Sequence, residues 1–174
     1  MNRALAFSAA ALPFALAAAL YATGALQRID AFIDSKLDRR RYKLEAPRPG
    51  PTRPLAEYAG WWQRDAMPPY GTEWVARIIV RAEGRRVWLR MWHECRPNYC
   101  EQGEFEADVY GTPPAEVCAL EVVRKKASDV LWVVTLRPNA HHPNLLITES
   151  RRSRDPVKNP HDNQSSVTAL RRVK

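Results

Sequence analysis

Residues 88–100, WLRMWHECRPNYC, decide the fold class that we predict for this chain. Successive side chains alternate between two faces, with Leu89, Met91 and His93 on one and Trp88, Arg90, Trp92 and Glu94 on the other. This period of two is typical of a β-strand. Cys95 and Cys100 then enclose Arg-Pro-Asn-Tyr, in which Pro97 has a fixed φ and Asn98 tolerates turn geometry. The stretch therefore predicts a strand followed by a short loop between two cysteines.

Similar segments recur through the rest of the chain. Turn-forming residues separate a short run near 60–62 from longer runs at 74–81, 86–94, 104–110, 118–124, 130–137, 144–151 and 165–173. Residues 83–85 predict a hairpin turn, and no helical periodicity follows residue 55. The pattern predicts a mainly β domain over residues 55–174, built either as an antiparallel β-sandwich or as a small β-barrel.

The N-terminal segment 4–26 has no charged side chain and would extend about 34 Å as a helix, enough to cross a bilayer core. The larger apolar side chains expected to anchor it are Leu5, Phe7, Leu12, Phe14, Leu16 and Leu20. Two interpretations are open: a transmembrane helix or signal-anchor over residues 1–27, which we favour, or a secretory signal cleaved near 22–25. Pro13 would kink the helix or mark a break in a signal peptide.

Charge and cysteine content give opposite indications of membrane topology. The segment is preceded by Arg3 and followed by Arg28, Lys36, Arg39, Arg40, Arg41 and Lys43. The positive-inside rule would place that cluster in the cytoplasm, whereas a disulfide between Cys95 and Cys100 would need an oxidising compartment. We favour a single-pass protein of the bacterial inner membrane with its β-domain in the periplasm.

Two further segments separate the anchor from the β-domain. Residues 28–44 predict an amphipathic juxtamembrane helix, whose apolar stripe is Ile29, Phe32, Ile33 and Leu37. This helix either continues the membrane span and packs on the domain or a neighbour, which we favour, or seats Arg39, Arg40 and Arg41 on anionic headgroups. Residues 45–54 contain four prolines and a glycine and predict a semi-rigid linker.

Several motifs of the β-domain form a set: Gly60-x-Trp62, Ile78-Ile79-Val80, Val87-Trp88-Leu89-x-Met91-Trp92 and Cys95-x-Pro97-x-x-Cys100-x-x-Gly103. With the closing strands, this set resembles a group of uncharacterised bacterial secreted or envelope β-domains, over about residues 58–173. Glu101-Gln102 departs from the acidic residue and Trp that are usual in that group. The resemblance implies an extracytoplasmic β-domain and implies no activity.

The cysteines allow three arrangements. A disulfide between Cys95 and Cys100 would rigidify the loop and leave Cys118 as a small buried side chain. His93 with the three cysteines could instead bind zinc, although H-x-C-x4-C is not a common zinc-binding spacing. Three reduced cysteines of a cytosolic protein are the remaining alternative. We favour the disulfide and expect no metal and no cofactor.

The other ionisable side chains do not form a recognisable catalytic set. Glu104, Glu106 and Asp108 share one face of a strand, where carboxylates could do acid–base work but are more often simply solvated. His141, His142 and His161 fall in polar loops, which favours exposed turn histidines over a metal site. Since no nucleophile, base and orienting group can be proposed together, we predict that the protein is not an enzyme.

The 174-residue chain is basic, with 27 Lys+Arg, 19 Asp+Glu and a formal charge of +8. Its basic residues are scattered, without an RNP-like aromatic pair or a Gly-rich phosphate loop, so no nucleic-acid partner is expected. The surface predicted to meet a partner consists of Trp88, Trp92, Ile29, Phe32, Ile33, Arg39, Arg40 and Arg41.

These features predict a non-catalytic, membrane-anchored accessory or scaffold subunit. Its partners would be the lipid bilayer and other subunits of a larger membrane protein complex, for example of respiratory or photosynthetic type. The alternative is a lipocalin-like envelope protein that binds a small apolar or carbohydrate ligand.

Overall fold

The computed structural model describes residues 38–42, 44–64, 74–95, 98–127, 130–153 and 164–173. The chain divides into two compact units, Met1–Leu44 and Glu45–Lys174. In the first unit, residues 38–41 are helical, and the N–H of Tyr42 donates to the carbonyl of Asp38 at 2.9 Å. The predicted anchor and the apolar stripe of the juxtamembrane helix lie outside the described residues. No helix within the described part is long and apolar enough to span a membrane.

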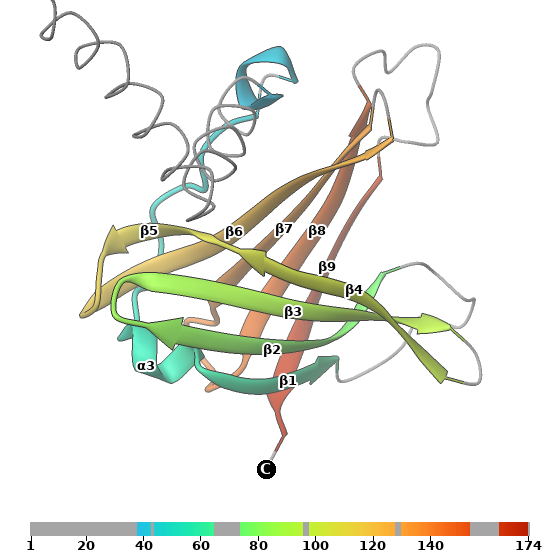
Figure 1. The fold of residues 1–174 in the computed structure, drawn as a ribbon. Coiled ribbons are helices and arrows are strands. Elements are labelled where there is room, and N and C mark those ends of the chain that lie inside the picture. The colour runs from blue at the N-terminus through green and yellow to red at the C-terminus, as the bar shows by residue number, and fades with distance from the viewer. Residues whose placement is uncertain are drawn as a thin grey trace, which may run out of the picture. The chain divides into compact units, whose positions relative to one another are not determined.

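The second unit is mainly β (Figure 1). Its elements in chain order are α3 (Leu55–Tyr58), β1 (Gly60–Arg64), β2 (Val75–Glu83), β3 (Arg86–Cys95), β4 (Asn98–Glu106), β5 (Asp108–Thr112), β6 (Glu116–Ala127), β7 (Val130–Pro138), β8 (Leu145–Ser153) and β9 (Ser165–Arg172). The mainly β class and the antiparallel pairing are therefore confirmed. The four-residue helix α3 corrects the expectation that no helix follows residue 55, because a single turn is too short to show a periodicity.

The strands form one sheet in the order β4-β3-β2-β1-β9-β8-β7-β6-β5, and every neighbouring pair is antiparallel. The sheet curls into a half-barrel, in which β2, β3 and β4 cross β6 to β9 at a steep angle (Figure 1). Strand β9 returns to pair with β1, with Trp62 opposite Arg172. An up-and-down order of strands thus encloses one core between the two sides of the curl.

The two end strands of this order, β4 and β5, are separated in the chain by Ala107 alone. The N–H of Ala107 still donates to the carbonyl of Val87 in β3 at 2.8 Å, whereas Asp108 already pairs with Glu121 in β6. The single strand predicted at 104–110 is therefore two strands that meet at a bend. Strand β4 also begins earlier than expected, at Asn98, inside the segment that was predicted to be a loop.

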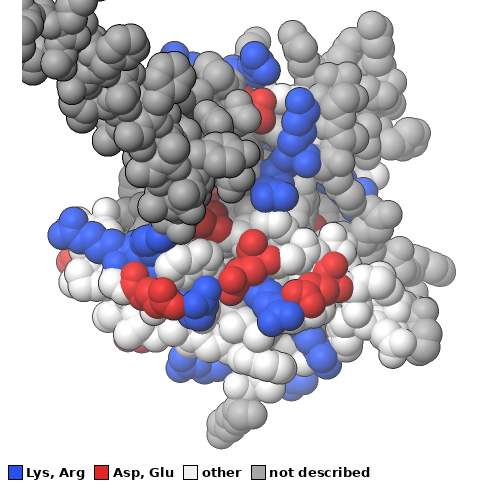
Figure 2. All heavy atoms as spheres, viewed as in Figure 1, with Lys and Arg blue, Asp and Glu red and all other residues white. Residues whose placement is uncertain are grey.

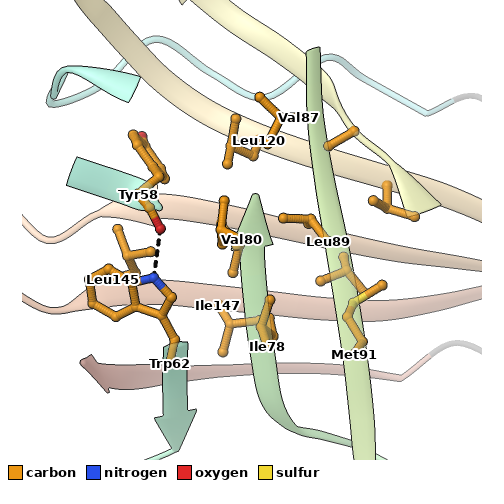
Figure 3. Packing of buried hydrophobic residues seen from close by; sticks show 14 of the residues in the cluster. Tyr58, Trp62, Ile78, Val80, Val87, Leu89, Met91, Leu120, Leu145 and Ile147 are labelled. Atoms are coloured by element: carbon orange, nitrogen blue, oxygen red, sulfur yellow. Dashed lines mark hydrogen bonds between the residues drawn. The ribbon is translucent and has the colours of Figure 1, made fainter. Parts of the chain in front are cut away.

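The alternation predicted for residues 88–94 is confirmed, and its apolar face is the buried one. Leu89 and Met91 are fully buried and His93 is 5% exposed, whereas Arg90 between them is exposed. Figure 3 shows Leu89 and Met91 in one interior cluster with Leu120 of β6 and with Leu145 and Ile147 of β8. This burial of apolar area is the main stabilising contribution to the fold.

Helix α3 closes one part of the core. Tyr58 is fully buried, and its hydroxyl donates to the carbonyl of Val117 at 2.9 Å. The indole N–H of Trp62 donates to the Tyr58 carbonyl at 2.7 Å, the contact drawn in Figure 3. Desolvation by burial raises the pKa of the Tyr58 hydroxyl. The side chain that looks polar in the sequence thus acts as a core residue with its one polar group satisfied.

The end of the Pro-rich linker is tied to the β unit through Arg53. Its N–H and carbonyl pair with Val117 of β6 at 3.0 and 2.9 Å. Its guanidinium donates to the carbonyl of Pro143 at 2.8 Å, to that of Asn139 at 3.0 Å, and to that of His142. The side chain of His142 is exposed, as was expected for a histidine in a polar loop.

Candidate functional site

Cys95 and Cys100 form the predicted disulfide, with an S–S distance of 2.02 Å and a Cα–Cα distance of 5.5 Å. The bond joins Cys95, the last residue of β3, to Cys100 near the start of β4, and in the register of these strands Cys95 lies opposite Asn98 and His93 opposite Cys100. Cys118 is a free, partly buried cysteine in β6. The zinc arrangement is therefore wrong, since two of its thiolates are joined to each other.

Replacing Cys95 and Cys100 together with serine is expected to lower the free energy of unfolding by about 2 kcal/mol. The two residues are five apart in sequence, so the bond removes the entropy of a short loop from the unfolded chain. Urea unfolding of the full chain in mild detergent measures the loss. Cys118→Ser, which removes no bond, is the control, and an equal loss in both variants would contradict the prediction.

The outer face of β2, β3 and β4 is a ladder of alternating charges. Figure 2 shows blue and red side chains following one another along this face. The pairs are Arg81–Glu104 at 3.3 Å, Arg86–Glu106 at 2.7 Å and Arg90–Glu101 at 2.7 Å. The hydrogen bond from Arg90 holds the pKa of the Glu101 carboxyl below its ordinary value. Because these side chains are mostly exposed, the ladder keeps the face soluble and adds little stability.

Trp88, one of the residues predicted for a partner surface, lies within this ladder. The guanidinium carbons of Arg81 and Arg86 lie 4.7 and 4.9 Å from its ring centroid. Its ring is therefore shielded by cations that have carboxylate partners of their own. Glu104 and Glu106 form the solvated side of β4, as predicted, but Asp108 belongs to β5 beyond the bend.

Trp92, the other predicted aromatic residue of that face, borders a groove of about 440 Å³ on the outside of β1 to β4. The side chains that line it from the outer face are Trp61, Gln63, Arg77, Ile79, Trp92, Tyr99 and Val173. Trp61 is 55% exposed and Val173 is 41% exposed, which is unusual for such large apolar groups. The groove is thus an open apolar surface with several aromatic rings.

Strand register explains why these residues meet. Gln63, Arg77 and Trp92 lie opposite one another in a row across β1, β2 and β3. Side chains in such a row are about 5 Å apart at Cβ, so they form one continuous surface. Trp61 and Ile79 form the next row, and the N–H of Val173 donates to the Trp61 carbonyl at 2.9 Å.

Arg77 is the charged residue in the wall of this groove. Its guanidinium carbon lies 3.7 Å from the centroid of the Tyr99 ring. Its Nε is covered and has no hydrogen-bond acceptor, and no carboxylate of the described residues pairs with it. Arg77 therefore differs from the arginines of the neighbouring ladder, which are neutralised by glutamates.

A second group of polar side chains surrounds Glu149 of β8, which is fully buried. Its Oε2 accepts the N–H of Val75 and its Oε1 accepts the indole N–H of Trp132, both at 2.7 Å. Nη2 of Arg64 lies 3.5 Å from Oε2, and Nε2 of His93 lies 3.9 Å from Oε1. The rings of His93 and Trp132 meet edge to face at 5.5 Å. The cluster thus joins β8 to β1, β2, β3 and β7.

Burial has opposite effects on the two charged members of this cluster. It raises the pKa of the Glu149 carboxyl, while the hydrogen bonds from Val75 and Trp132 and the charge of Arg64 oppose that shift. It lowers the pKa of the Arg64 guanidinium, which the nearby Glu149 raises. Arg64 also donates from Nε to the Val75 carbonyl at 2.5 Å. Glu149 thus pairs with Arg64, Val75 and Trp132 away from solvent, and the arrangement is a structural clamp that ties β8 to its neighbours.

The sequence alone did not single out most of the residues that line the groove or surround Glu149. Glu149 has the same parity as Leu145 and Ile147 in its strand, and that alternation could have marked it as an inward-facing carboxylate. Tyr99 was assigned to a loop. Of the other predicted partner residues, Arg39, Arg40 and Arg41 lie in the first unit, whose placement relative to the groove is not described, and Ile29, Phe32 and Ile33 lie outside the described residues.

No protein-family model, curated protein or solved structure matches this chain. The outer groove and the buried cluster therefore have to be interpreted from their own geometry. Of the two, the groove alone is open to solvent, which makes it the candidate binding site.

Proposed function

We propose that this protein is a non-catalytic accessory subunit that holds a partner protein through the outer groove of its β unit. The observation that carries this proposal is the exposure of Trp61 and Val173 beside the rings of Trp92 and Tyr99. Tryptophan, tyrosine and arginine are the residues that most often dominate the energy of a protein interface. Groups of this kind, gathered in a groove and left exposed, fit a surface that is covered in an assembly.

The surroundings of the groove support the same proposal. The paired charges of β2, β3 and β4 adjoin it on the outer face, since Arg90 lies opposite Ile79 of the groove. An apolar centre with a polar, solvated border is the usual layout of a protein–protein interface. The energy of binding would then come from the groove, and the charge ladder would contribute to orientation and specificity.

We further propose that an N-terminal segment anchors the protein in a bacterial inner membrane and that the β unit lies in the periplasm. The Cys95–Cys100 disulfide supports this placement, because such bonds persist in oxidising compartments. The uncharged segment 4–26 is long enough to span a bilayer as a helix. The disulfide and the uncharged segment are both observations that do not depend on the groove.

The lipocalin-like alternative would place a ligand inside the curled sheet. In the described part, apolar side chains such as Leu89, Met91 and Ile147 fill that space as a core (Figure 3). The outer groove, at about 440 Å³, lies within the size range of small-molecule sites. Its exposure on an open sheet face nevertheless favours a macromolecular partner over an enclosed ligand.

Site-specific photo-crosslinking in native membranes tests the accessory role. A benzophenone amino acid at Val173, which lines the groove, is expected to give one defined adduct with a partner protein. The same residue at Val167, a 66% exposed position on β9 away from the groove, is the matched control. Trp92→Ala should reduce the Val173 adduct about tenfold or more, as the loss of a central aromatic contact does. Trp88→Ala should leave it unchanged.

The same experiment can contradict the proposal. Equal adducts from the two positions would mean that the groove has no special role, and the absence of a protein adduct from Val173 would remove the partner protein itself. Circular dichroism of each variant checks that the β unit remains folded.

A further inference from the structure

We infer that the groove recognises a carboxylate next to an apolar side chain, so that the partner segment contributes an acidic residue to Arg77 and an apolar residue to the aromatic rings. This inference rests on the proposed function and names the chemistry of the same site. It commits to an acidic, amphipathic segment of a protein as the occupant of the groove.

The charges of the outer face carry the first step. Arg81, Arg86 and Arg90 each have a glutamate within 3.3 Å. Arg77 lies on the same face, yet no carboxylate of the described residues pairs with its guanidinium. Buried or half-buried polar groups of folded proteins nearly always have a partner, and an arginine without one selects an anion. Charge complementarity therefore points to an acidic ligand group.

The orientation of Arg77 carries the second step. Its guanidinium stacks on the ring of Tyr99 at 3.7 Å, so Tyr99 occupies one planar face of the group. The N–H donors of a guanidinium point outward within its plane, where a carboxylate can accept two of them side by side. The stacking thus limits the rotation of the guanidinium, and because Nε is covered, the terminal Nη N–H groups are the donors left to bind the anion.

The neighbours of Arg77 carry the third step. Trp92 lies beside it in the row across β3, and Trp61 and Ile79 form the next row. If a ligand carboxylate pairs with Arg77, an apolar side chain next to that carboxylate would therefore contact the aromatic and aliphatic side chains beside Arg77. Gln63, on the other side of Arg77, adds an uncharged amide that can donate to the same anion.

A set of small probes tests this chemistry on the full chain in mild detergent. The probes are 3-(4-fluorophenyl)propionate, its amide, its amine analogue and 4-fluorophenyl phosphate, each followed by ligand-observed fluorine NMR. We expect the propionate to bind roughly tenfold more tightly than the amide, which is the gain of one charge-assisted pair. The amine should bind more weakly than either.

Variants connect this preference to Arg77. Arg77→Gln should make the propionate and the amide bind equally, whereas Arg86→Gln, which alters an arginine that pairs with Glu106 outside the groove, should keep the preference. Arg77→Lys, which keeps the charge but loses the planar fork, should retain part of it. Added salt should weaken the preference of the unaltered protein, so the inference can be tested even where a variant does not fold.

Three outcomes would overturn the inference. These are equal binding of propionate and amide to the unaltered protein, a preference that survives Arg77→Gln, and binding of the phosphate alone, which would indicate a lipid headgroup or nucleic acid. In each case the crosslink from Val173 still decides separately whether a protein occupies the groove.

Discussion

Replacing Glu149 with alanine is expected to destabilise the β unit by about 3–5 kcal/mol, a large part of the roughly 5–15 kcal/mol by which folded domains are stable. The change removes the acceptor of the Val75 N–H, of the Trp132 indole N–H and of the buried Arg64 guanidinium at once. An uncompensated buried cation and two unpaired donors cost far more than the pair contributed when intact. Urea unfolding followed by circular dichroism measures the loss.

The matched control is Glu104→Ala, which also removes a glutamate that pairs with an arginine. The Glu104 side chain is 41% exposed and its pair with Arg81 is solvated, so we expect a loss of less than about 1 kcal/mol. A Glu149 variant that loses no more than the Glu104 variant would show that water reaches the cluster and that the clamp is unimportant.

A double replacement separates the stability lost because Arg64 is left unpaired from the stability lost because the Glu149 side chain no longer fills its space. Arg64→Met combined with Glu149→Leu removes both charges and should recover most of the stability lost in Glu149→Ala, because no charge is left buried alone. If the double variant is as unstable as the single one, the loss comes from packing around β8 and not from an unpaired Arg64.

Alternation within single strands was readable from the sequence, whereas the meeting of strands was not. The inward face of β3 follows from the spacing of Leu89, Met91 and His93, and burial confirms it. The groove requires in addition that Arg77 stand between Gln63 and Trp92. That neighbourhood depends on two strand registers, and one of them shifts between Val75 and Arg77. A shift of one residue would have turned these side chains to the other face.

The bend at Ala107 illustrates the same limit at the level of topology. The sequence of residues 98–112 predicts a loop and one strand. In the structure these residues form β4 and β5, which lie at the two ends of the sheet order and pair with β3 and β6 respectively. Which partner a strand takes depends on where distant segments lie. By contrast, the Cys95–Cys100 bond was predictable because the two cysteines are only five residues apart in the sequence.

The outer aromatic residues show why exposure cannot be inferred from parity alone. Trp88 and Trp92 lie on the same side of β3, and the sequence predicted one surface from both. Two arginines lie over the Trp88 ring, whereas only Arg90, at 5.2 Å, lies over the Trp92 ring among the described residues, and Trp92 also lines the groove. Each tryptophan lies opposite an arginine of β2 and a glutamate of β4, but Arg77, opposite Trp92, stacks on Tyr99, whereas Arg81 stacks on Trp88. The difference therefore comes from how the arginine side chains are placed, which neither parity nor register gives.

Gly111→Ala is the second change from which we expect a large effect, a loss of about 3 kcal/mol or more in the free energy of unfolding. Gly111 has a φ of +116°, which L side chains rarely adopt, and it lies at an irregularity in the pairing of β5 with β6. A Cβ there would lie 2.1 Å from the carbonyl oxygen of Glu116 and 3.1 Å from the Cys118 nitrogen. Both of these are backbone atoms, so the clash cannot be relieved by turning a side chain.

Gly84→Ala is the control for this effect. Gly84 also has a positive φ, of +62°, in the turn between β2 and β3, but a Cβ there meets nothing within 4 Å. We expect it to cost about 1 kcal/mol, the conformational penalty without a clash. Hydrogen exchange should then show the amides of β5 and the facing part of β6 losing protection in Gly111→Ala but not in Gly84→Ala. Equal losses of stability in the two variants would mean that β5 moves away from β6 at little cost, and that the pairing next to the bend at Ala107 contributes little to holding the curled sheet together.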